Sequence, residues 1–326
     1  MDRYAGGVVL AEVVRSGFVE SLHRGSLVVL GPDFSVRHAA GDVVGAIFPR
    51  SSNKPMQAVG MLRAGLRPAE PADLALISGS HFGEPFHVER VRALLRSAGL
   101  DTTALRCPAD LPLSASARTA VLRAGGGPEA ILMNCSGKHA GMLVTCVTAG
   151  WPTDGYLDPG HPLQVALAAA VTGLAGEPVA ATGVDGCGAP VFALSLTGLA
   201  AAFLRLVDAP PGTPERRVAD AMRAHPALVA GTDADDTRLM DGVPGLLSKG
   251  GAEGVLAVAV PDAGAVALKI DDGGMRARMP VLVAALRRLG LAAPVLGELS
   301  EVPLFGGGSP VGAVVATGEG GVIHAS

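Results

Sequence analysis

The chain changes character at Pro49-Arg50-Ser51-Ser52-Asn53-Lys54-Pro55-Met56-Gln57, where short β-rich segments give way to segments with helical patterning. Ser51 stands three residues before Lys54, so a helix starting near Ser52 would place both side chains on one face. Serine is a poor nucleophile at neutral pH, and a lysine amine can take its proton only where burial or a nearby cation lowers the lysine pKa. The spacing therefore predicts a nucleophile, Ser51, beside its base, Lys54, although four-residue matches of this kind also arise by chance.

Lysine is scarce in this chain, which strengthens the prediction. Among 26 lysines and arginines only four are lysine, namely Lys54, Lys138, Lys249 and Lys269. Arginine serves wherever a solvated positive charge is enough, so a remaining lysine is expected where an amine must lose its proton. Lys269 lies in an ordinary strand pattern, and for this residue we expect no special role.

Length, charge and composition narrow the class of function. At 326 residues the chain can bury a large core, as one domain or as two lobes that share a cleft. A net charge of −4 and a pI near 6.1 give no basic footprint for nucleic acid. Aromatic residues make up only 3% of the chain, so stacking platforms for bases or sugars are not expected. These values favour a small polar substrate.

Mean hydropathy is high, at +0.40, and residues 186–204 form an uncharged run of 19 residues. Gly186 to Pro190 would break a helix, so we predict a buried core helix over 191–207 rather than a membrane span. The N-terminus has neither the basic nor the apolar region of a signal peptide, which predicts a cytoplasmic protein that does not contact membranes. Its four cysteines are then expected to stay reduced.

Strand patterns occupy both ends of the chain, with helical patterns between them. Strands are predicted over 8–14, 18–21, 26–30, 35–38, 255–260, 265–270 and 311–317, and helices over 53–64, 70–78, 85–98, 111–122, 162–175, 191–207, 214–224 and 274–289. The polar segment 133–142 passes into a further helix that ends near Gly150. This order predicts an α+β fold: an antiparallel sheet flanked by helices, with a helical region over the cleft. We expect a single two-lobed catalytic domain over 1–326, with the sheet from about 1–50 and 245–326 and the mostly helical part over about 51–244. Together with Ser-x-x-Lys, the arrangement is similar to that of serine β-lactamases and serine-dependent glutaminases.

Two polar loops have competing interpretations. In the loop 78–85, Ser80 is either a second hydroxyl of the site with His81 as base or orienting group, or the loop caps the helix that begins at Pro85. The acidic segment 230–238 either binds an ammonium group of the substrate or is a solvated helix start. Lys249, followed by two glycines at the edge of a strand, can reach a cleft.

Two further motifs contain cysteine. In a helical turn Cys135 has Lys138 at i+3 and His139 at i+4, and Asp185-Gly186-Cys187 supplies a second thiol beside a carboxylate. Two thiolates and an imidazole would suit tetrahedral Zn²⁺ with one open position. Without a C-x-x-C motif, an ordinary structural role for these residues remains the alternative.

Five motifs occur together in this sequence: Arg50-Ser51-Ser52-Asn53-Lys54-Pro55, Ser80-His81-Phe82-Gly83-Glu84, Asn134-Cys135-Ser136-Gly137-Lys138-His139, Asp185-Gly186-Cys187-Gly188-Ala189-Pro190 and Lys249-Gly250-Gly251-Ala252-Glu253-Gly254. In this order they resemble the rhizobial-type (class 3, asparaginase II) L-asparaginases. The resemblance spans Arg50 to Gly254, with departures at Asn53 and Phe82. It implies hydrolysis of L-asparagine to L-aspartate and ammonia through a Ser-Lys covalent acyl-enzyme mechanism, and a homodimer.

The resemblance also implies residue roles. Ser51 and Lys54 correspond to the nucleophile and its base, and Ser80 and Lys249 to a second Ser-Lys pair. Zinc would be held by Cys135, Lys138 and Cys187, which replaces His139 by Lys138 as the third ligand and suggests that zinc shapes the pocket or orients substrate. Arg50, His139 and Asp185 are then assigned to substrate binding. The alternative function is a serine-dependent glutaminase, or another amide or acyl hydrolase of β-lactamase-like fold; a non-catalytic zinc or amino-acid sensor would lack Ser51 or Lys54.

Overall fold

The structure is a computed structural model that describes residues 3–318. Contacts divide the chain into two compact units. Unit 1 contains residues 1–52, 193–208 and 238–326, and unit 2 contains residues 53–192 and 209–237. The boundary falls between Ser52 and Asn53, inside the Ser-x-x-Lys motif.

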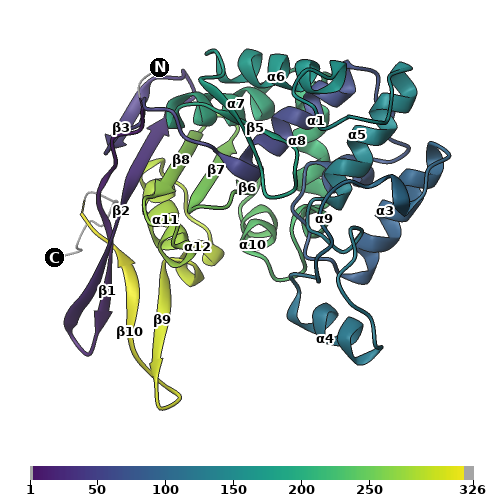
Figure 1. Ribbon diagram of the computed structural model, residues 1–326. Helices are drawn as coiled ribbons and strands as arrows, with labels where there is room; N and C mark the ends of the chain where they lie inside the picture. The colour runs from purple at the N-terminus through teal and green to yellow at the C-terminus, as the bar shows by residue number, and fades with distance from the viewer. Residues whose placement is uncertain (1–2, 319–326) are drawn as a thin grey trace. The chain divides into compact units, whose positions relative to one another are not determined.

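Unit 1 is built on an eight-stranded sheet in the order β6-β7-β8-β2-β1-β10-β9, with β3 also paired to β2. Its strands are β1 (Val8–Arg15), β2 (Phe18–Leu30), β3 (Val36–Ala40), β6 (Leu247–Gly250), β7 (Val255–Val260), β8 (Gly264–Ile270), β9 (Glu301–Gly306) and β10 (Ser309–Ala316). All these pairs are antiparallel, and Figure 1 shows N-terminal β1, in purple, beside C-terminal β10, in yellow.

Helices of unit 1 pack against this sheet. They are α7 (Leu196–Asp208) and α11 (Arg278–Arg288), which is preceded by the 3₁₀ turn η3 (Met275–Ala277). A short helix, α12 (Pro294–Glu298), follows α11 along the chain. Successive strand residues point to opposite faces, so the continuous burial of β7 means that both of its faces are covered. Both α7 and α11 contact β8. The predicted α+β fold, with an antiparallel sheet flanked by helices, is confirmed.

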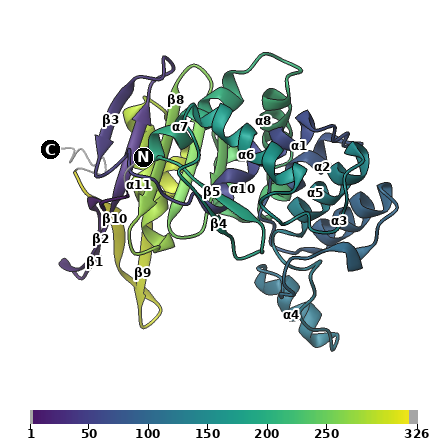
Figure 2. The same cartoon turned by 45° about the horizontal axis from the view of Figure 1, so that its top comes forward.

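Unit 2 is mostly helical, and Figure 2 shows α1, α2, α3 and α5 grouped together. Its elements are α1 (Lys54–Arg63), α2 (Pro71–Ile77), α3 (Pro85–Ser97), η2 (Thr102–Ala104), α4 (Ala115–Arg123), α5 (Ser136–Ala149), α6 (Pro162–Ala175), α8 (Pro214–Ala224), α9 (Pro226–Val229) and the hairpin β4 (Ala181–Val184) to β5 (Pro190–Ala193). The 3₁₀ turn η1 (Arg50–Asn53) and α10 (Asp235–Gly242) each cross the boundary between units. Glycines in the left-handed conformation, Gly150 and Gly176, end α5 and α6.

Several predicted boundaries were wrong. β2 is one continuous strand, because Gly25 is not a turn residue: a Cβ there would lie 2.2 Å from the carbonyl oxygen of Lys269 on the paired strand β8. The helix predicted over 191–207 is strand β5 followed by α7. None of the helices within residues 3–318 combines the length and the apolar character needed to cross a bilayer.

Candidate active site

The Ser-x-x-Lys motif lies at the start of α1. Arg50 to Asn53 form η1, and α1 begins at Lys54, with Pro55 in its first turn, where a missing N–H costs no hydrogen bond. Ser51 is part of unit 1 and partly exposed, whereas Lys54 is part of unit 2 and 1% exposed. Three consecutive peptide units join them, so their Cα atoms are at most about 11 Å apart.

Lys54 is the centre of a polar cluster inside unit 2. Its Nζ lies 2.6 Å from the carbonyl oxygen of Gly79, 2.8 Å from Ser80 Oγ and 3.2 Å from Cys135 Sγ. A buried amine is tolerated only where such partners satisfy it. The structure thus brings two other predicted site residues, Ser80 and Cys135, into contact with the Nζ atom of Lys54.

Lys249 and Ser51 lie on neighbouring segments of unit 1. The hydroxyl of Ser52 donates to the carbonyl oxygen of Lys249 over 2.8 Å, and both residues are buried. A Cβ on Gly251 would lie 2.3 Å from the carbonyl oxygen of Pro49, so only glycine allows this backbone approach. Lys249 Nζ donates to the carbonyl oxygen of Gly250 over 2.6 Å. The end of β6 therefore fixes the segment that carries Ser51.

Two residues of this region adopt a left-handed backbone without being glycine. Arg50 has φ 53° and Glu253 has φ 60°. This conformation costs a residue with a Cβ about 1–2 kcal/mol. Arg50 Nη1 and Glu253 Oε1 form an ion pair at 3.6 Å, and Glu253 is 61% exposed. An exposed pair of this kind adds only ~0–1 kcal/mol of stability.

Two cysteines and a lysine meet next to Lys54 in unit 2. Cys135 immediately precedes α5, Lys138 lies in its first turn, and Cys187 lies in the turn between β4 and β5. Lys138 Nζ lies 3.2 Å from Cys187 Sγ, and the two sulfurs are within hydrogen-bonding reach of each other. All three side chains are at least 97% buried.

The electrostatics of this cluster favour one thiolate. The hydrogen bond from Cys187 lowers the pKa of Cys135 well below its usual value against the effect of burial, with help from the charges of Lys54 and Lys138. The same hydrogen bond and burial raise the pKa of Cys187. Burial lowers the Lys138 pKa, but the charges of Cys187, Cys135 and Asp185 outweigh it, so the net shift is upward. These shifts make Cys135 the more acidic thiol of the pair, with Cys187 as the donor to it.

His139 and Asp185 border the same cluster. His139 Nδ1 lies 2.7 Å from the hydroxyl of Tyr156, and the His139 ring is also within hydrogen-bonding reach of Cys187. Asp185 Oδ2 lies 3.9 Å from Cys187 Sγ. Burial lowers the pKa of His139, so its ring is neutral at pH 7.

Two sets of side chains in this cluster are candidate ligands for a metal ion. Within residues 3–318, no three His, Cys, Asp or Glu side chains are arranged to hold an ion. This result does not favour the set Cys135, Cys187 and His139 that spacing alone suggested. The other set includes Lys138: a pair of adjacent sulfurs with an amine at 3.2 Å from one of them has sulfur and nitrogen donors of the kind that Zn²⁺ takes.

The loop that carries Ser80 is held by buried histidines. Gly83 N–H donates to His81 Nδ1 over 3.1 Å, which leaves the His81 Nε2–H to donate to Ser136 Oγ at 2.9 Å. Burial, then His87 and Lys54, lowers the His81 pKa well below 6.5. Glu84, not Ser80 or His81, caps α3. His81 thus positions the loop, and Ser80 is left to contact Lys54.

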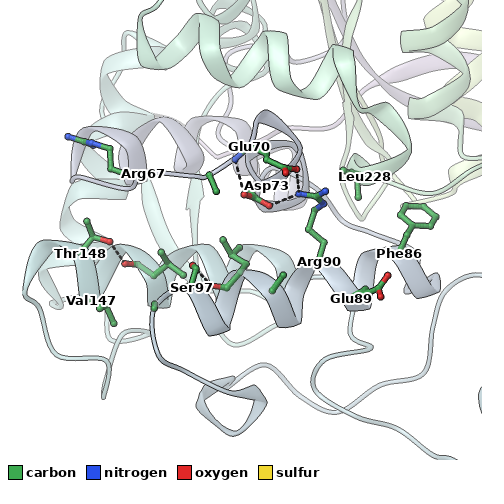
Figure 3. A pocket seen from close by; sticks show the side chains of 15 residues that line it. Arg67, Glu70, Asp73, Phe86, Glu89, Arg90, Ser97, Val147, Thr148 and Leu228 are labelled. Atoms are coloured by element: carbon green, nitrogen blue, oxygen red, sulfur yellow. Dashed lines mark hydrogen bonds and ion pairs between the residues drawn. The ribbon is translucent and has the colours of Figure 1, made fainter.

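Other residues near the site had no role of their own assigned from the sequence. Gly251 and Glu253 stood in the motif that contains Lys249, whereas Tyr156 lay outside the motifs because a lone tyrosine carries no spacing signal. A groove of about 700 Å³ lies elsewhere in unit 2, along α3 and the start of α2 (Figure 3). Among its charged lining residues, Arg90 pairs with Glu70 and Asp73, and none of the predicted site residues lines the groove.

Comparison with known proteins identifies the family. The chain matches the family model of L-asparaginase II over residues 11–316, nearly its whole length. It belongs to the L-asparaginase II family. The resemblance drawn from its motifs is therefore confirmed, and membership of this asparaginase family supports an asparaginase-type amidohydrolase that acts on a small molecule.

Solved structures similar to this L-asparaginase II family member are distant. A β-lactamase from Mycobacterium bovis is 16% identical, covers 85% of this chain and 95% of its own, and has a TM-score of 0.45. A Bacillus subtilis glutaminase, solved as a covalent complex with 5-oxo-L-norleucine, is 14% identical, with coverages of 75% and 79% and a TM-score of 0.33. At such low identity and TM-score, neither similarity bears on the activity of this chain. No curated protein matches it.

Proposed function

We propose that this protein hydrolyses L-asparagine to L-aspartate and ammonia, with Ser51 as nucleophile and Lys54 as its base. The observation that carries the proposal is the buried amine of Lys54, which has a hydroxyl, a carbonyl and a sulfur as neighbours and stands three residues after Ser51. A lysine in such surroundings, within a family named for asparagine hydrolysis, is expected to act on protons rather than to solvate the surface.

The reaction would run as a double displacement. Ser51 Oγ attacks the carbon of the side-chain amide while Lys54 Nζ takes the hydroxyl proton, and the same proton then leaves with ammonia. Water next attacks the β-aspartyl ester and loses a proton to Lys54, which passes this proton to Ser51 Oγ as the ester bond breaks and aspartate leaves. Ser80, in contact with Lys54, and Lys249, near the Ser51 segment, would form a second pair that relays protons. The positive charge of Arg50 suits the α-carboxylate of the substrate, and the negative charge of Asp185 suits its α-ammonium group. The neutral ring of His139 can form a hydrogen bond with the substrate.

A zinc ion is proposed at Cys135, Lys138 and Cys187. The adjacent sulfurs of Cys135 and Cys187, with the Lys138 amine 3.2 Å from Cys187, support this site. Zinc would displace the ligand protons as it binds. When bound, zinc would fix these side chains and orient substrate, because Ser51 already supplies a nucleophile. Lys138→Met is expected to lower the zinc content of purified protein, whereas Lys269→Met should not. Equal zinc content in both variants would contradict the site.

The test of function is ammonia release by the purified protein from L-asparagine and, in parallel, L-glutamine. Release from asparagine that disappears in Lys54→Ala is expected. Release from glutamine alone would point to the glutaminase alternative, and release that persists in Lys54→Ala would contradict the proposed base. A homodimer in the cytoplasm remains the expectation for this protein; sedimentation velocity tests its oligomeric state.

A further inference from the structure

The two strained residues near Ser51 lie in contact with each other. Arg50, the residue before Ser51, and Glu253 both have positive φ, and their side chains form an ion pair. A residue with a Cβ stays in the left-handed conformation only where its surroundings hold it there. The question is therefore which contacts hold Arg50 and Glu253.

Glu253 is held from both its backbone and its side chain. Lys269 Nζ donates to the carbonyl oxygen of Glu253 over 2.9 Å and to that of Ile270 over 3.3 Å. A Cβ on Gly273 would lie 2.9 Å from Glu253 Oε2, so the carboxylate packs directly over this glycine. Lys269, for which the sequence predicted no special role, thus anchors Glu253 through a partly buried amine.

Arg50 lies between two fixed points of the segment that carries Ser51. Pro49 is fixed by the close approach of Gly251, and Ser52 by its hydrogen bond to the carbonyl oxygen of Lys249. Between them, the Arg50 side chain reaches Glu253. A change of the Arg50 dihedral angles would rotate the Ser51 peptide and move its hydroxyl.

We propose that Glu253 and Lys269 are positioning residues for Ser51: Lys269 anchors the Glu253 backbone, and the Glu253 carboxylate holds Arg50 in the left-handed conformation that aims the Ser51 hydroxyl. This inference rests on the proposed function, because it takes Ser51 as the nucleophile. Neither residue contacts the reacting atoms. Both act through Arg50.

The test is the rate at which a fluorophosphonate ester labels Ser51, followed by intact-protein mass and peptide mapping. In this reaction the Ser51 Oγ–P bond forms, fluoride leaves and the hydroxyl proton passes to the base, so no amide substrate is needed. Glu253→Gln should slow labelling about five- to tenfold, since misplacing a reacting group has effects of this order or larger. Lys269→Met should slow it similarly. The matched control is Glu298→Gln, which removes an equally exposed ion pair, with Arg238, in the same unit.

A double-mutant cycle separates positioning from a merely structural role. Glycine adopts φ 53° without strain, so in an Arg50→Gly background the ion pair no longer matters. Glu253→Gln should then leave the labelling rate unchanged. Equal slowing in both backgrounds, or no slowing in either, would overturn the inference alone. Wild-type protein that is not labelled at Ser51 would overturn the inference together with the proposed nucleophile.

Discussion

The two units place their site residues by different means. In unit 1, Ser51 and Lys249 are positioned by backbone contacts: a glycine under a carbonyl, a serine-to-carbonyl hydrogen bond and a strand end. In unit 2, Lys54, Cys135, Lys138 and Cys187 form a buried ionisable cluster in which each group alters the pKa or the hydrogen bonding of the next. Backbone contacts thus dominate around the predicted residues of unit 1, and coupled ionisable groups dominate around those of unit 2. Substitutions in the two units should therefore reduce activity in different ways.

The largest effect is expected from a substitution in the buried ionisable cluster of unit 2. Lys54→Met keeps the volume of the buried side chain and removes its amine, so the protein should fold while the turnover of asparagine falls about 10²- to 10⁴-fold, the usual contribution of a general base. Ammonia release and the circular dichroism spectrum are the measurements. Turnover within tenfold of the wild type would show that Lys54 is not the base.

The next effect tests position in unit 1. In Gly251→Ala the new Cβ meets the Pro49 carbonyl at 2.3 Å, so the Ser51 segment must shift, at a cost of about 1–3 kcal/mol in the free energy of unfolding. The loss of transition-state stabilisation, calculated from the fall in turnover, should be at least as large as this loss in the free energy of unfolding. Gly297→Ala in α12, with no atom within 4 Å of its Cβ, is the control and should be neutral or stabilising. Equal behaviour of the two variants would refute backbone positioning.

Lowering the pH should reduce the stability of the protein through buried histidines of unit 2. Burial lowers the pKa of His81 and His87, whereas in the unfolded chain both titrate near pH 6.5. Below pH 6.5 the unfolded state therefore binds more protons, and stability is lost as the pH falls, by about 1.4 kcal/mol per pH unit for each histidine until its folded pKa is reached. Urea unfolding at pH 7, 6 and 5 measures this loss. His87→Gln should reduce the slope, and a stability that does not change between pH 7 and pH 5 would argue against the prediction.

The smallest effect concerns an exposed ion pair. Arg238 and Glu298 lie 2.7 Å apart, but both are more than a third exposed. Removing the pair with Glu298→Gln should change the free energy of unfolding by less than about 1 kcal/mol. Thermal unfolding measures this change. A larger loss would mean that this surface ion pair contributes more to the stability of unit 1 than exposed pairs usually do.

Much of the fold could be predicted from the sequence, because strand and helix periodicities were strong. Failures occurred where a local signal is ambiguous. Pro190 to Ala193 is a short apolar run, which periodicity cannot assign to strand or helix. β9 contains Pro303, which argues against a strand, yet β9 is the last strand in the sheet order, an edge position where a missing N–H is tolerated.

The site was predictable only where residues carry chemistry in a fixed spacing. Lys54, Ser80, Cys135, Lys138, His139 and Cys187 stood in motifs, and the structure gathers them within unit 2. Lys269 and Glu253 could not be foreseen, because their importance lies in backbone carbonyls and left-handed dihedral angles that no sequence pattern encodes.

The central claim is that Ser51, from unit 1, and Lys54, from unit 2, act together in covalent catalysis. The most direct measurement is peptide mass mapping of the protein quenched in acid during turnover of L-asparagine, with Ser51→Ala as the control. An aspartyl ester on the peptide that contains Ser51, absent from Ser51→Ala and strongly reduced in Lys54→Met, is the predicted result. An ester on Ser80 instead, or one that forms equally well in Lys54→Met, would contradict the account.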